Sequence, residues 1–202
     1  MEVTKIRLSK AELEMVSNSE LILTKNRIIR IAICLLEAAM GRMQFEAGDN
    51  TGFPFNNTPK ISKGENYEGL PFAILDYPRI ADAGALCFVR SMFWWGNFFS
   101  STLHLSGKYK IAFERKVIDA YQLLSDREYF VCVSDEQWGH HFRNDNYKEI
   151  RSFLPAQFEE LVRSALFIKI AKKHSLSEWE EIELMLFNNW RFLSGLVSEA
   201  VK

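Results

Sequence analysis

The sequence has little of the charge imbalance that identifies many binding partners. Its 25 Lys and Arg are balanced by 26 Asp and Glu, so the formal net charge is −1 at pH 7. Nucleic acids and anionic membrane surfaces attract proteins largely through a basic excess, which is missing here. We therefore expect no nucleic-acid partner and no membrane partner.

Cysteine is also scarce. The 202 residues include three cysteines, Cys34, Cys87 and Cys132, and no two of them are close enough to form a CxxC pair. An odd number of widely spaced cysteines in apolar surroundings favours reduced thiols over a disulfide framework. The first residues, MEVTKIRLSK, contain no apolar segment of a secretory signal. These observations predict a cytoplasmic protein.

Long apolar runs and recognisable catalytic motifs are absent as well. Charges interrupt the apolar stretches well before the ~18 residues that a membrane-spanning helix needs. The sequence contains no P-loop, no GxGxxG after a strand, no GxSxG and no HExxH. It therefore predicts no cofactor and no metal site, names no catalytic residue, and leaves open whether the protein is an enzyme.

The composition is ordinary for a globular protein, with 48% hydrophobic residues, and the length fits one domain over residues 1–202. Helical signals are concentrated near the two ends of the chain. Ser9 and Glu12 form a capping box, which predicts a helix over about 10–17. Apolar residues at spacings of three and four then predict a long, central helix that Gly48 ends.

The C-terminal part predicts two further helices. Pro155 favours a helix start, and the apolar spacing continues to about residue 174. A second capping box at Ser177 opens a last helix with an apolar stripe that includes Trp190 and Val197. The stripe fits a core face, or, if the domain cannot cover it, a homodimer interface formed by this C-terminal helix.

Strand signals occupy the middle of the chain. Alternating or β-branched residues predict strands at 70–77, 86–95, 98–105 and 129–134, with a helix at 107–124 and a long irregular loop at 47–69. Neighbouring strands with short connections pair antiparallel. We therefore predict an α+β fold in which long N- and C-terminal helices pack on a sheet of about four strands, mostly antiparallel.

The segment RSMFWWGNFFSSTLHL, residues 90–105, concentrates five aromatic rings around one Gly-Asn pair. A two-residue turn at Gly96 and Asn97 would place Trp95 opposite Phe98. Because side chains alternate along strands, Thr102 and His104 would share that face, giving small polar groups below aromatic walls. This is typical of ligand pockets, although core packing is the more common role of aromatic hairpins.

The opposite face of this hairpin would be apolar except for Arg90. A buried guanidinium without a partner costs several kcal/mol, so Arg90 requires a counter-charge. We expect it from Asp76 on the preceding strand or from a helix glutamate.

A second group of polar and aromatic residues lies in the loop after the fourth predicted strand. Trp138, His140 and Arg143 fall within six residues of one another. Loops that follow strands often carry binding residues, although ordinary loop histidines are more common than site histidines. Loops 47–69 and 135–147 would form the rim of a site on the hairpin.

Three hypotheses for function follow. The first is a small-molecule-binding module whose site combines the residues named above: Trp95, Phe98, Thr102, His104, Trp138, His140 and Arg143. The second is an interaction or structural protein, for example a homodimer through the C-terminal helix. The third is an enzyme that depends on His104 and His140, since imidazole titrates near neutral pH.

Overall fold

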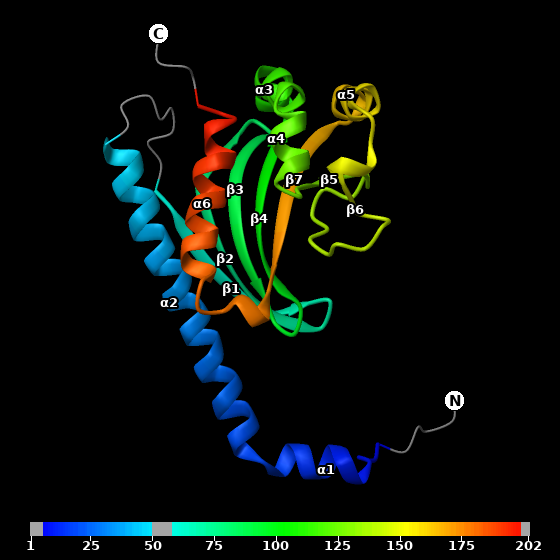
Figure 1. Cartoon of the computed structure of the whole chain (residues 1–202). Coiled ribbons are helices and arrows are strands. Elements are labelled where there is room, and N and C mark those ends of the chain that lie inside the picture. Colours follow the sequence, from blue (N-terminus) through cyan, green and yellow to red (C-terminus); the bar gives the residue numbers. More distant parts are fainter. Residues whose placement is uncertain (1–5, 50–57, 199–202) are drawn as a thin grey trace.

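The computed structural model describes residues 6–49 and 58–198 and shows a curved antiparallel sheet with helices over one of its faces (Figure 1). The sheet has seven strands in the order β1-β2-β3-β4-β7-β5-β6. They are β1 (Lys60–Tyr67), β2 (Leu70–Asp82), β3 (Ala85–Trp94), β4 (Phe98–Ser106), β5 (Phe130–Cys132), β6 (Tyr147–Glu149) and β7 (Phe167–Ser175). The chain is therefore α+β, but the prediction of about four strands was wrong.

Three of the strands were not predicted, each for a physical reason. Strand β1 lies in the segment expected to be irregular, and its sequence KISKGENY is largely polar because one edge and much of its surface face solvent. Strand β6 has three residues, too few for a periodic signal. Strand β7 lies where a helix was expected, because the apolar spacing of the preceding helix continues into it.

The α-helices are α1 (Lys10–Ser17), α2 (Ser19–Asp49), α3 (Gly107–Asp119), α4 (Tyr121–Asp126), α5 (Pro155–Ser164) and α6 (Ile182–Gly195). The predicted capping box between Ser9 and Glu12 is present at the start of α1. Helices α2 and α6 pack against each other and against the sheet, and α3 contacts α5 (Figure 1). Helices at both ends of the chain are confirmed, but the helix from Pro155 ends at Ser164 and the predicted capping box at Ser177 was wrong. The capping box lies at Ser175 and Glu178 around a 3-10 turn, and α6 begins at Ile182.

The main core lies between these helices and one face of the sheet, which we call the helix face. Its strand residues include Leu75, Val89, Phe93, Leu103 and Ile170, all nearly inaccessible to solvent. The apolar stripe of α6 faces this core: Ile182, Leu186, Trp190 and Leu193 are buried. Because the domain covers this stripe, it is not available as the dimer interface considered above.

The opposite face of the sheet, the loop face, is covered by residues 133–146, which connect β5 and β6. Tyr147, at the end of this connection, stacks on Phe142 at 4.7 Å between ring centroids and is fully buried. A loop thus covers this face, whereas helices α2 to α6 cover the other. Within the described residues, no helix has the length and apolar character that a membrane span requires.

One edge of the sheet is incomplete. Strand β5 pairs with β7 only at Phe130 with Ala171 and Val131 with Ile170, while β4 pairs with β7 along its full length to Ser175. Within the described part of the chain, residues 172–175 therefore have a strand neighbour on the β4 side alone.

Candidate functional site

The hairpin turn differs from the predicted one by one residue. The register pairs Trp94 with Phe98 and Arg90 with Thr102, so three residues, 95–97, form the turn. The predicted pairing of Trp95 with Phe98 was wrong. Trp95 lies toward the helix face, where its ring meets Phe93 at 6.4 Å, and it does not lie beside Thr102. A wall formed by Trp95 above Thr102 and His104 is therefore absent.

The corrected register brings Arg90 onto the loop face together with Thr102 and His104. Arg90 makes two hydrogen bonds to Asp76, from Nε to Oδ1 at 2.7 Å and from Nη2 to Oδ2 at 2.9 Å. Both side chains are largely shielded from water, which makes this bidentate pair a structural necessity. The predicted partner of Arg90 is confirmed.

The loop is attached to this face through polar contacts. Arg90 Nη1 lies 3.1 Å from Nε2 of His140, which must accept, because a guanidinium only donates. Gln137 donates to Nε2 of His104 at 3.0 Å, and the ammonium of Lys169 donates to the carbonyl of Gly139. We call Asp76, Arg90, His104, His140 and Lys169 the covered cluster.

Burial sets the protonation of the two histidines in the covered cluster. It lowers the pKa of His104 to about 3 and that of His140 to about 2, and the nearby charges of Arg90 and Lys169 act in the same direction. Burial also lowers the pKa of Lys169 to about 8. Both imidazoles are thus neutral and poor proton acceptors at neutral pH. The enzyme hypothesis stays a prediction that these pKa values do not favour.

Of the predicted ligand residues, Thr102, His104, Trp138 and His140 come together on the loop face, where Trp138 packs edge-on to His104 at 5.5 Å. The loop itself packs on Thr102 and His104 and holds them away from solvent. Phe98 packs on Phe142 at 5.1 Å, and Phe142 lines a surface pocket of about 800 Å³ along β5 and β6. Arg143 is exposed and pairs with Glu68.

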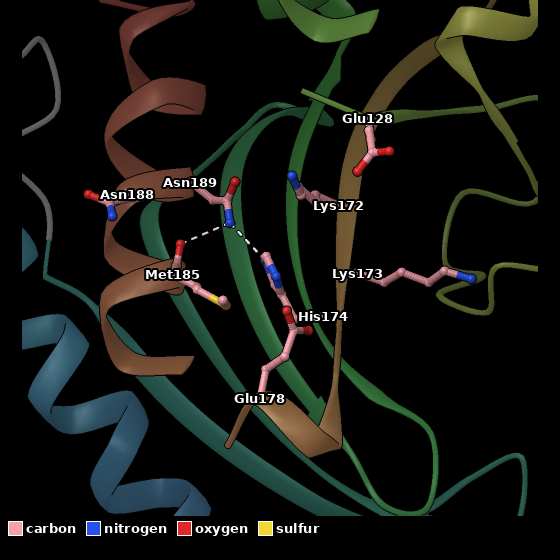
Figure 2. A pocket seen from close by; sticks show the side chains of 8 residues that line it. All are labelled: Glu128, Lys172, Lys173, His174, Glu178, Met185, Asn188 and Asn189. Atoms are coloured by element: carbon pink, nitrogen blue, oxygen red, sulfur yellow. Dashed lines mark hydrogen bonds between the residues drawn. The ribbon is translucent and has the colours of Figure 1, made fainter. Parts of the chain in front are cut away.

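An open pocket lies on the helix face, between β7 and α6 (Figure 2). It has a volume of about 450 Å³ and is lined by Glu128, Lys172, Lys173, His174, Glu178, Met185, Asn188 and Asn189. The pocket opens where β5 has ended and β7 is paired with β4 alone. The space that β5 would fill beside residues 172–174 of β7 is occupied by the pocket. We call it the β7–α6 pocket.

A chain of hydrogen bonds holds the inner wall of this pocket. Asn189 donates to Nε2 of His174 at 2.8 Å and to the carbonyl of Met185 at 2.8 Å (Figure 2). It also accepts from the hydroxyl of Tyr129 at 2.6 Å. With Nε2 accepting, the ring proton of His174 lies on Nδ1. Burial lowers the pKa of His174 to about 4, and the charge of Lys172 acts in the same direction. His174 is therefore neutral and fixed in orientation.

Charged side chains line the pocket around neutral His174. Figure 2 shows Lys172 on the same side of β7 as Asn189, whereas the side chain of Lys173 points away across the strand. The Lys172 ammonium donates to the carbonyl of Arg127 at 2.8 Å. Glu178 accepts from the backbone N–H of Ser175 at 2.7 Å, which holds its carboxylate in place. The pocket thus presents the ammonium of Lys172, the carboxylates of Glu128 and Glu178, and the amide of Asn188 around His174.

Sequence reasoning missed this pocket because it assigned residues 167–174 to a helix. As a strand, FIKIAKKHS alternates, so Lys172 and His174 share one face with Ile168 and Ile170. The spacing of two residues between Ile168 and Ile170 was the signal in the sequence that indicated a strand. Within the described residues, no three His, Cys, Asp or Glu side chains are grouped so that they could hold a metal ion.

Comparison of the chain with protein-family models, with curated proteins and with solved structures found no match.

Proposed function

We propose that this protein binds a small molecule carrying a carboxylate in the β7–α6 pocket. The volume of about 450 Å³ lies within the range of roughly 300–1,000 Å³ usual for small-molecule sites. Asn188 and the Nδ1–H of neutral His174 can donate hydrogen bonds to polar groups, and Met185 offers an apolar contact, while both donors of Asn189 are already used within the pocket wall. The proposed site thus differs from the predicted one: it lies along β7, which pairs with β4, and not on the hairpin itself.

The ammonium of Lys172 is the observation that carries the proposal. It is only partly exposed, and among the described residues the carbonyl of Arg127 is the hydrogen-bond acceptor that it meets. An ammonium has three donors, so donors remain for a ligand oxygen. Asn189 and His174 are already fixed by their mutual bond, so a ligand would lose little free energy in ordering them.

Binding can be tested with acetate, glutamate and citrate as probes and glucose as the uncharged comparison. We expect at least one carboxylate to raise the melting temperature and to shift the NMR resonances of the His174 ring. Lys172→Met should abolish both effects, because it removes the cation and keeps the aliphatic stem. Lys63→Met, at an exposed position of β1, is the matched control and should bind as the parent protein does.

Two results would contradict the proposal. One is an unchanged His174 spectrum with all three carboxylates at millimolar concentration. The other is carboxylate binding that Lys172→Met and Lys63→Met weaken to the same extent, which would show unspecific charge attraction.

A further inference from the structure

Helix α1 and the first turn of α2 project from the body of the protein (Figure 1). We call residues 6–24 the N-terminal arm. None of the residues of α1 is buried. The arm nevertheless carries large apolar side chains that are about half exposed or more: Leu13, Met15, Val16, Leu21, Ile22 and Leu23.

These side chains border an apolar groove of about 760 Å³ between the arm and the end of the hairpin. Met15 and Val16 of α1 line one side, Ile22 of α2 lies at the bend, and Pro71 and Trp95 close the other side. Trp95, which does not lie on the loop face as predicted, lines this groove. Its ring forms part of an apolar surface at the base of the arm.

An arm of this kind is not stable alone in water. A helix of eight residues without tertiary contacts is well below the ~12–15 residues at which isolated helices become even marginally stable. Exposed apolar side chains offer on the order of 100 Å² each, so the arm presents several hundred Å², close to the roughly 800 Å² that one partner gives to a standard interface. Single monomers seldom expose a patch of this size.

The charges along the arm favour one kind of partner. Glu20 on the first turn of α2 is exposed, as are Arg27 and Arg30 on the next turns, whereas Glu14 pairs with Lys10 within α1. Among the described residues, Glu20, Arg27 and Arg30 have no ion-pair partner in the chain itself. An antiparallel second arm would set Glu20 of one copy against Arg27 and Arg30 of the other.

We propose that two copies of this chain associate through their arms, with α1 of each copy lying in the apolar groove of the other. In a two-fold arrangement both grooves are filled in the same way, because each copy provides the same helix and the same groove. The exposed apolar residues of α1 then become buried, and Glu20 approaches Arg27 or Arg30 of the second copy. This interface is independent of the β7–α6 pocket.

The mass in solution tests this interface directly. Light scattering coupled to size exclusion should give a dimer for the full chain at micromolar concentration. Val16→Glu should raise the dissociation constant at least tenfold, because it places a charge in the interface. Val16 is 69% exposed in the single copy, so this change leaves the fold intact, which circular dichroism checks. Leu166→Glu, at a position 88% exposed after α5, should leave the dimer unchanged.

Hydrogen exchange gives a second measurement that does not depend on a variant. The amides of α1 should be protected at dimer concentrations and should exchange freely after dilution below the dissociation constant. A monomer at all concentrations would overturn the proposal, as would a dimer that Val16→Glu leaves intact or that Leu166→Glu disrupts equally.

Discussion

At the scale of single residues, Arg90 and His174 show what the sequence could and could not predict. The need of Arg90 for a carboxylate follows from the apolar residues around it, so Asp76 was one of the two kinds of partner expected, beside a helix glutamate, although the assumed register was wrong. The role of His174 depends on Asn189, fifteen residues away on a different element. No local pattern connects the two, so this contact appears only once β7 and α6 are placed.

The ion pair of Arg90 predicts a large difference between two aspartates of β2. Asp76→Asn leaves the largely buried guanidinium without a counter-charge and should lower the free energy of unfolding by about 3–5 kcal/mol. Asp82→Asn removes the partner of Lys108 at an exposed site and should cost less than about 1 kcal/mol. Urea unfolding of both variants measures the difference, and equal effects would contradict the role given to burial.

At the scale of helices and strands, the signals of α1 and α2 were interpreted correctly, whereas short or polar strands were missed and the apolar spacing of β7 was taken for a helix. The capping box of α1 and the apolar spacing of α2 correspond to the observed helices. The two-residue turn was wrong because Gly96 also fits a three-residue turn, in which its φ of 72° is the left-handed conformation that glycine adopts easily. Pairing across the hairpin, which decides between the turns, is a tertiary property.

The buried and the exposed face of helix α2 can be tested by substitutions on each face. Leu36 is fully buried against the core, whereas Phe45 on the same helix is 74% exposed. Leu36→Ala should lower the free energy of unfolding by about 2–5 kcal/mol, because it removes buried methyl groups and leaves a cavity. Phe45→Ala should change it by no more than about 0.5 kcal/mol. Denaturant titration of the two variants checks this orientation of the helix.

At the scale of the whole molecule, the sheet is covered by apolar helices on one face and by a loop with polar contacts on the other. The sequence predicted the helix side, because amphipathic spacing shows which side of a helix is buried. It did not predict the loop side, because the loop is held by Arg90, Lys169 and His104, which come from separate strands. Only their positions in the sheet bring these three together.

The three neutral histidines make the stability of the molecule dependent on acid. In the unfolded chain they bind protons near pH 6.5, whereas in the folded protein the pKa values are about 3 for His104, about 2 for His140 and about 4 for His174. Between these values the unfolded state binds more protons, so stability falls as the pH falls. Each histidine contributes up to about 1.4 kcal/mol per pH unit.

Urea unfolding between about pH 7 and pH 5 measures this loss of stability. His104→Gln, which removes one of the three groups, should reduce the slope of the unfolding free energy against pH by roughly a third. Equal stability across this range would show that the histidines accept protons in the folded state.

Because β5 pairs with β7 at two positions only, part of β7 is an open edge of the sheet. Where β5 ends, β7 continues as an edge whose backbone could join a strand from another molecule. Lys172 and Lys173 lie at this edge, and charged side chains, lysine above all, hinder such sheet-to-sheet addition. We expect the two lysines to hinder this addition, so a variant lacking both should aggregate more readily than the parent protein.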